Sequence, residues 1–164
     1  MHNSITAIGF YDAMSFDQVD FILNQTELTT LVVSEDYADK IIKMKAGQQA
    51  VNVTHLIVTE EVSAEFIQAA KNVGVKIITY DSVIQAGENV FPRNFENCTE
   101  DHVYIFSYTS GTTGDSKGVK LTHKNIMTMV RCTISRVQMS PGETLISYLP
   151  YPHVFESILL AFSL

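Results

Sequence analysis

The sequence predicts an α/β fold in which layered βαβ units are built around a mainly parallel sheet. Two observations predict this fold. Short β-branched runs alternate with segments whose apolar residues recur every three or four positions. The chain has 164 residues and an apolar fraction of 46%, enough for one globular domain with its own core. Strands that alternate with helices form parallel sheets through right-handed crossovers, with the helices on the sheet faces.

The first predicted helix begins at residues 15–18, Ser-Phe-Asp-Gln, which resemble a capping box. In such a box, the first and fourth side chains pair with backbone N–H groups that the helix leaves free. Val19, Ile22 and Leu23 then share one helical face. We expect the polar residues 24–26 to end this helix.

Two pairs of strand and helix follow. Residues 30–33 and 55–59 are short β-branched runs, which are typical of strands. Residues 36–46 and 63–73 place their apolar residues on one side, which predicts helices, and Gly74 is positioned to end the second helix. The predicted apolar faces consist of Ala38, Ile41 and Ile42 in the first helix and of Phe66, Ala69, Ala70 and Val73 in the second.

A third strand precedes a change of pattern. Residues 75–80 repeat the strand pattern. Residues 86–101 are mostly polar and contain Gly, Pro and Asn, so they predict a surface connection and not a domain boundary. Residues 102–108 predict a strongly apolar strand, and residues 109–118 a loop rich in glycine and hydroxyl groups.

The last part of the chain predicts a helix, a turn, a strand and a further helix. We expect Thr122 to cap a helix over residues 125–137. Residues 140–143 predict a turn, and residues 144–149 a strand. Residues 153–164 begin an apolar helical segment that stops without a cap or a polar tail, so we expect the chain to be the front part of something longer.

Charge and composition argue against several classes of protein. A formal net charge of −7 and a pI near 5.1 argue against a general nucleic-acid binder, which needs clustered Lys and Arg. Cys98 and Cys132 form neither a CxxC pair nor a metal-ligand spacing, as expected in a reducing intracellular compartment. The N-terminal residues lack a signal-peptide pattern. The longest apolar run, residues 158–162, is far shorter than the roughly 20 residues of a membrane span.

Residues 108–118, Tyr-Thr-Ser-Gly-Thr-Thr-Gly-Asp-Ser-Lys-Gly, contain the groups that a polyphosphate site needs. Glycines let backbone N–H groups converge on an anion, and Lys117 adds a mobile charge. The loop follows an apolar strand, at the sheet edge where α/β folds bind ligands. A Walker A loop is disfavoured, because Gly118 follows Lys117 where that loop needs Ser or Thr. A surface loop without function is the alternative, and the agreement of strand, glycines, hydroxyls and lysine disfavours it.

The loop resembles the phosphate-binding motif of the adenylate-forming superfamily, whose usual form is YTSGTTGxPKGV. Ser116 stands where proline is usual, so we expect a looser loop that keeps its phosphate-binding groups. Residues 148–156, Tyr-Leu-Pro-Tyr-Pro-His-Val-Phe-Glu, are similar to the YLPLAHxFE segment of long-chain acyl-CoA synthetases. Tyr151-Pro152 departs from the usual Leu-Ala, which bears on the shape of the acyl pocket more than on the reaction. Residues 8–12 and 22–27 also resemble that subfamily, so the resemblance covers nearly the whole chain.

The resemblance implies a long-chain fatty-acid–CoA ligase. Such an enzyme joins a fatty acid to ATP as an acyl-adenylate, with Mg²⁺ as the metal, and coenzyme A then captures the acyl group. It implies that Lys117 contacts the polyphosphate, that Thr112 contacts Mg²⁺, and that His153 acts at the entrance for the carboxylate. The implied phosphate cradle consists of Thr109, Ser110, Gly111, Thr112, Thr113 and Gly114.

The histidines leave one alternative open. A lone histidine such as His153 by itself favours a structural role, and the resemblance of its segment gives a role at the substrate entrance equal support. We expect His123 to begin the helix that follows it. The spacings of the other histidines, His2, His55 and His102, predict no metal site.

Two further interpretations stay open beside the long-chain ligase. Residues 1–164 are expected to be a partial N-terminal AMP-binding domain, because the family's downstream Mg²⁺-binding Glu, ribose-binding Asp and catalytic Lys are missing. A truncated, non-catalytic nucleotide-binding fragment is therefore one alternative. A sister ligase for an aryl, amino or short-chain acid is the other. The resemblance also implies an intracellular location, at the cytosolic face of the endoplasmic reticulum or of another organelle membrane, with any attachment made by parts outside this chain.

Overall fold

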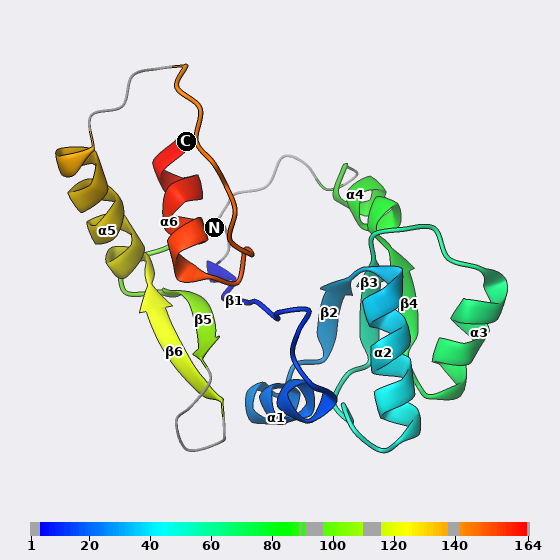
Figure 1. The fold of residues 1–164 in the computed structure, drawn as a ribbon. Coiled ribbons are helices and arrows are strands. Elements are labelled where there is room, and N and C mark those ends of the chain that lie inside the picture. Colours follow the sequence, from blue (N-terminus) through cyan, green and yellow to red (C-terminus); the bar gives the residue numbers. More distant parts are fainter. Residues whose placement is uncertain (1–3, 89, 91–96, 110–115, 138–141, 164) are drawn as a thin grey trace. The chain divides into compact units, whose positions relative to one another are not determined.

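The computed structural model describes residues 4–88, 90, 97–109, 116–137 and 142–163 (Figure 1). The chain divides into two compact units. Unit 1 consists of Met1–Met14 and Asn94–Leu164, and unit 2 of Ser15–Arg93. The units meet at two borders along the chain, one after Met14 and one after Arg93. The second falls inside residues 86–101, where we expected a connection without a boundary. These residues are mostly polar, so they carry little apolar surface with which to join two cores.

Unit 2 is built on a parallel sheet with the strand order β2-β3-β4. Leu31 pairs with Leu56, and Leu56 with Ile77, so one apolar row crosses all three strands. The predicted parallel sheet is confirmed in this unit. The elements of unit 2 are α1 (Phe16–Thr26), β2 (Thr30–Val33), α2 (Glu35–Ala46), β3 (His55–Val58), α3 (Ala64–Asn72), β4 (Lys76–Thr79) and α4 (Tyr80–Glu88).

The capping box predicted for α1 is confirmed. The Ser15 Oγ accepts the Gln18 N–H at 3.3 Å, and the Gln18 Oε1 accepts the Ser15 N–H at 3.0 Å. The helix runs through residues 24–26, which we expected to end it. Asn24 donates to the Asp20 carboxylate one turn earlier, at 3.1 Å, and such a pair supports a helix. The helix ends at Glu27, whose backbone is left-handed with a φ of 52°.

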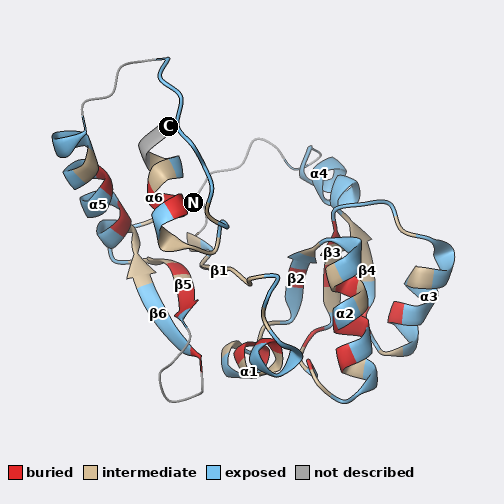
Figure 2. Ribbon diagram, in the orientation of Figure 1, coloured by how far each residue is buried: buried red, intermediate tan, exposed pale blue. Residues whose placement is uncertain are grey.

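The core of unit 2 lies between the sheet and its helices (Figure 2). The predicted apolar faces of α1 and α2 are buried, as expected. The predicted face of α3 is only partly confirmed, because Ala70 is buried whereas Ala69 is exposed and Phe66 is half-buried. α3 contacts β4, one of the two edge strands of the sheet. An edge strand buries a narrower face of a helix than the middle of a sheet does.

Helix α4 was not predicted, and the expected strand over residues 75–80 stops at Thr79. The Thr79 Oγ1 accepts the Ser82 N–H at 3.4 Å, so Thr79 opens the helix. No residue of α4 is buried, and Val83 and Ile84 are 40% and 47% exposed. The helix has nine residues and follows β4 without an intervening loop, so the strand pattern of residues 75–80 hid its start.

Unit 1 contains a mixed sheet with the order β1-β5-β6: β1 (Ala7–Ile8), β5 (Val103–Thr109) and β6 (Lys117–Thr122). β1 runs parallel to β5, and β6 runs antiparallel to it. We had expected Lys117 and Gly118 to lie in the loop, but they belong to strand β6. β6 runs antiparallel to β5 because the connection between them is short. Parallel neighbours need a crossover of a dozen or more residues, whereas a short loop can close an antiparallel hairpin.

Two helices of unit 1 pack against each other: α5 (His123–Arg136) and α6 (Val154–Ser163). Ile126 and Val130 from α5 are buried with Ile158 from α6 (Figure 2). Both helices were predicted, α5 with the N-cap Thr122 and with His123 at its first position. Among the described residues, none of the helices combines the length and the apolarity that a membrane span requires.

Residues 144–149, predicted as a strand, form no strand. Their β-branched and aromatic pattern is real, but Ile146 is 77% exposed and Tyr148 is 70% exposed. Neither sheet in the described part of the chain includes this segment, and a strand needs a hydrogen-bonding neighbour. Of the predicted turn at residues 140–143, residues 140 and 141 lie outside the described residues, and Gly142 has a φ of 92°.

Candidate active site

The candidate site lies at the loop end of the β5–β6 hairpin. Thr109 ends β5 and pairs with Lys117, the first residue of β6. The Thr109 hydroxyl donates to the Lys117 carbonyl at 3.5 Å, and both residues are exposed. Directly opposed residues of an antiparallel pair share one face of the sheet. The structure therefore brings a hydroxyl and a cation together at the base of the predicted phosphate loop.

The rest of the predicted cradle lies outside the described residues. Their predicted contacts with phosphate, and that of Thr112 with Mg²⁺, stay predictions. Within the described part of the chain, no three His, Cys, Asp or Glu side chains are grouped so that they could hold a metal ion. The exposed Lys117 and Thr109 fit an anion such as a polyphosphate. The cradle residues concerned are Ser110, Gly111, Thr112, Thr113 and Gly114.

Both ends of the loop are anchored in the protein. Tyr108, which precedes Thr109, is only 5% exposed, and Ser116, which precedes Lys117, is 8% exposed. Removal from water raises the pKa of the Tyr108 phenol. That Ser116 loosens the loop stays a prediction, although its side chain is buried. A buried residue thus stands next to each of the exposed residues Thr109 and Lys117, at which the chain leaves and re-enters the sheet.

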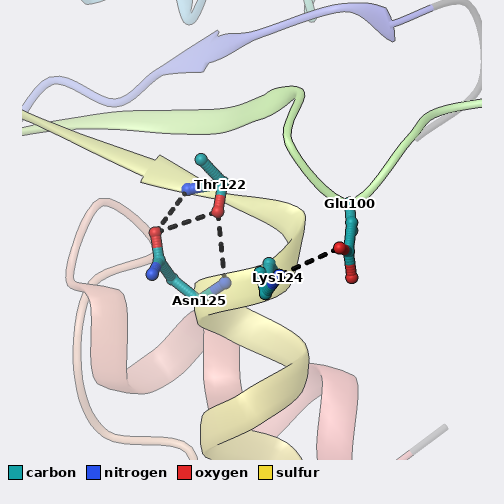
Figure 3. A network of polar contacts seen from close by, with 4 residues as sticks. All are labelled: Glu100, Thr122, Lys124 and Asn125. Carbon is teal, nitrogen blue, oxygen red and sulfur yellow. Dashed lines mark hydrogen bonds and ion pairs between the residues drawn. The ribbon is translucent and has the colours of Figure 1, made fainter.

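The helix that follows the hairpin is fixed at its first turn (Figure 3). The Thr122 N–H and hydroxyl donate to the Asn125 Oδ1 at 2.9 and 3.0 Å, and the Asn125 N–H donates back to the Thr122 Oγ1 at 3.3 Å. Lys124 lies 2.9 Å from the Glu100 carboxylate, which raises the pKa of Lys124. Both partners of this ion pair are exposed, so it stabilises the protein little. The reciprocal cap of Thr122 and Asn125 therefore fixes the start of α5, directly after β6, more firmly than this ion pair does.

The His123 ring is held against an aromatic side chain at the start of α5. Its centroid lies 5.3 Å from that of Tyr104, with an angle of 76° between the rings. The buried Nε2 of His123 has no hydrogen-bond partner among the described residues. Burial, and then the nearby His102, lower the pKa of His123 below its usual value of 6.5. The folded protein therefore favours the neutral ring.

We expect the substitution His123→Phe to reduce the acid sensitivity of unit 1. Because the folded pKa lies below the unfolded value, the protonation of His123 costs no stability above about pH 6.5, and stability is lost as the pH falls through the folded pKa. Phe keeps the edge-to-face contact and removes the unpaired nitrogen, so stability at neutral pH should stay equal or rise by up to about 1 kcal/mol. Urea unfolding between about pH 5 and 7.5 measures both effects. Equal losses on acidification in the variant and the parent would contradict the prediction, and His55→Phe in unit 2 is the control.

His153 stands at the start of α6. The Phe155 N–H donates to the His153 Nδ1 at 3.2 Å, and the Glu156 N–H donates to the His153 carbonyl at 3.0 Å. The imidazole thus pairs with a backbone donor that the first turn leaves free. An Nδ1 that accepts a hydrogen bond places the ring proton of the neutral form on Nε2. Of the two roles left open for His153, the structure shows the structural one, and the role at the entrance stays a prediction.

A buried carboxylate on α6 was missed as a separate feature. Glu156 is 3% exposed, and its two oxygens accept the Ser147 hydroxyl and, at 3.4 Å, the Leu149 N–H. It therefore holds residues 147–149 against α6. The signal was present in the sequence, because an acidic residue between Phe155 and Ile158 must find hydrogen-bond donors when it is buried.

The segment that resembles the synthetase motif also contacts the end of β1. A Cβ added at Gly9 would lie 2.8 Å from the Pro152 Cβ, so glycine is required there. Two separate stretches of the resemblance, residues 8–12 and 148–156, thus meet in unit 1. Among the described residues, no hydrogen bond joins His153 to Thr109 or Lys117. The structure thus shows contacts within the Thr109–Lys117 pair and within residues 147–156, and no hydrogen bond between these two groups among the described residues.

Comparison with known proteins identifies relatives over nearly the whole chain. "Fatty acyl-CoA synthetase B" of Dictyostelium discoideum is 27% identical over 158 residues, which cover 96% of this chain and 23% of that protein. "Long-chain-fatty-acid--CoA ligase 1" of Homo sapiens is 26% identical and is matched by 94% of this chain and over 23% of its own length. The chain thus spans less than a quarter of the length of these curated relatives.

A solved structure shares the fold. The A domain of the carboxylic acid reductase of Segniliparus rugosus, solved with AMP and a co-purified carboxylic acid, matches 96% of this chain with a TM-score of 0.70, at 18% identity and over 28% of its own length. The α/β fold is therefore that of adenylation domains. The family model described as "AMP-binding enzyme" matches residues 3–164, and the chain accordingly belongs to the AMP-binding enzyme family.

Proposed function

We propose that this chain supplies the ATP-holding part of a ligase that activates long-chain fatty acids and passes them to coenzyme A. The observation that carries the proposal is the pair Thr109 and Lys117 at the base of the phosphate motif. The printed names of two relatives, a fatty acyl-CoA synthetase and a long-chain-fatty-acid–CoA ligase, support the choice of acid. By resemblance, the reaction takes place inside the cell, at the endoplasmic reticulum or another organelle membrane.

In this proposal, the residues of the hairpin neutralise the negative charge of the phosphates of ATP. The carboxylate and the triphosphate are both anions, so their approach requires cations and hydrogen-bond donors around the phosphate. Lys117 supplies a cation on an exposed strand end, and the neighbouring Thr109 hydroxyl can turn from the Lys117 carbonyl toward an oxygen of the nucleotide. Mg²⁺, when bound, neutralises further phosphate charge. The buried Tyr108 and Ser116 hold both ends of the loop in place.

His153 acts on the acid in this proposal. Its Nδ1 is engaged by the Phe155 N–H, so the neutral ring carries its proton on Nε2 and can donate it as a hydrogen bond to a carboxylate. The backbone of α6 orients the ring. His153 is thus a positioning donor that needs no proton transfer.

A second candidate is a sister ligase for another carboxylic acid. The observation that favours it concerns Pro152, which stands where the long-chain segment usually has alanine. Pro152 packs against Gly9. Competition between fatty, short-chain and aromatic acids in hydroxamate formation by the intact protein separates the two candidates. The long-chain proposal is abandoned if palmitate fails to compete where an aromatic or short-chain acid does.

The substitution Lys117→Ala tests the first step directly. Loss of one charge-assisted contact costs about 1.5–3 kcal/mol, so ATP–pyrophosphate exchange by the intact protein should fall roughly 10- to 100-fold. Lys71→Ala is the control for the loss of a positive charge, because Lys71 is exposed on α3 of unit 2. Both variants lose one positive charge. Unchanged exchange in Lys117→Ala, or an equal loss in both variants, removes the proposed role of Lys117.

A further inference from the structure

The Tyr108 ring covers the backbone of its cross-strand partner in the hairpin. Tyr108 pairs with Gly118 in the antiparallel register, one position from the Thr109–Lys117 pair. A Cβ added at Gly118 would lie 3.1 Å from the Tyr108 Cζ and 3.3 Å from both its Cε1 and its hydroxyl oxygen. The outer half of the ring therefore occupies the space that a side chain at position 118 would need.

The pair has a physical effect on the strands. Gly118 has no side chain, and β6 is the edge strand of the β1-β5-β6 sheet, so glycine would leave the backbone there uncovered. An aromatic ring laid across the partner strand restores this cover and pins the register. Phe106 and Lys120, the next pair on the same face, add a weaker cation–π contact at 5.7 Å. The two aromatic residues hold β6 along one face.

Register decides where the charged side chain points. Side chains alternate along a strand, so a slip of β6 by one residue against β5 moves Lys117 to the opposite face. A Cβ beneath the ring would force the ring to shift by a few tenths of an ångström, and Gly118 is flanked by Lys117 and Val119. A slipped register would therefore press the ring against a side chain. The Tyr108–Gly118 contact favours the one register in which Lys117 stands opposite Thr109.

We propose that Tyr108 is a positioning residue whose ring, seated on Gly118, locks the β5–β6 register and so fixes Lys117 and Thr109 at the base of the phosphate loop. The inference rests on the proposed function, in which this loop binds the polyphosphate of ATP. Tyr108 need not touch the nucleotide. Its effect reaches ATP through the placement of Lys117.

The experiment is a double-mutant cycle in the intact protein, with ATP–pyrophosphate exchange as the assay. Gly118→Ala displaces the ring, and Tyr108→Leu removes the two ring carbons and the hydroxyl oxygen nearest to position 118. Each single variant should raise the KM for ATP roughly tenfold or more, because small misplacements of a binding group have large effects, and should lower kcat less. In the double variant, Gly118→Ala should add nothing to the effect of Tyr108→Leu. Tyr108→Phe keeps the ring and should keep the KM within about twofold of the parent.

The outcomes distinguish a register fixed by the Tyr108 ring from simpler explanations. An equal rise in KM from Gly118→Ala in both backgrounds overturns the inference, because position 118 would then act without the ring. A Tyr108→Phe variant as impaired as Tyr108→Leu also overturns it, since the hydroxyl and not the ring would matter. If Gly118→Ala does not fold, the comparison of Tyr108→Phe with Tyr108→Leu decides alone. A parent protein without any exchange activity refutes the proposed function instead.

Discussion

The substitution Leu56→Ala is expected to lower the free energy of unfolding of unit 2 by about 2–5 kcal/mol. Leu56 is fully buried in β3, the central strand of the parallel sheet. Its side chain lies in the apolar row with Leu31 and Ile77. Truncation removes three carbon atoms from the core and leaves a cavity that strands fixed on both sides cannot close.

Urea unfolding with hydrogen exchange at the amides of β3 measures this loss. Val32→Ala is the matched control, because Val32 lies on the neighbouring strand but is 60% exposed. The control loses only strand propensity, which is worth up to about 1 kcal/mol. Equal losses in the two variants would show that Leu56 is not part of a close-packed core.

The substitution Glu156→Leu is expected to lower the free energy of unfolding of unit 1 by about 2–4 kcal/mol, because two hydrogen bonds to a carboxylate are lost. The Ser147 hydroxyl and the Leu149 N–H lose their acceptor. The Leu149 amide should exchange with solvent much faster, since that hydrogen bond ties residues 147–149 to α6. Glu156→Gln keeps one amide oxygen as an acceptor and should cost about half as much.

Glu143→Leu is the control for the loss of a carboxylate in the same unit. Glu143 is exposed, so its replacement should change stability by less than about 0.5 kcal/mol. Hydrogen exchange at Leu149 distinguishes a local from a general effect. If Glu156→Leu leaves the protection of this amide unchanged, the carboxylate does not anchor the segment.

Much of unit 2 could be predicted from the sequence because its signals are local. The capping box at Ser15 and the strand at residues 30–33 depend on neighbours a few positions away. The buried face of α2 depends on a period of three to four residues. Helix α4 escaped prediction because it follows β4 directly and the strand pattern hid its start. The exposure of Ala69 was not predicted because it depends on the width of the sheet, which all the strands together decide.

The family could be predicted from the motif, whereas the geometry of the candidate site could not. The glycines, hydroxyls and Lys117 of the predicted phosphate loop led to the right family, and phosphate binding by the loop stays a prediction. The pattern did not show that Lys117 and Gly118 belong to an antiparallel strand, since loop and hairpin end have the same composition. Residues 144–149 illustrate the reverse case, because a strand-like pattern forms no strand without a neighbour.

By itself, the sequence determined the α/β class, most of the helices and strands, and the family, because these depend on local propensity, period and a contiguous motif. Only the tertiary structure decided that Tyr108 covers Gly118, that Pro152 rests on Gly9, and that Glu156 holds Leu149. These contacts join residues that lie apart along the chain. Their existence depends on the register of strands and the packing of helices, which no local pattern records.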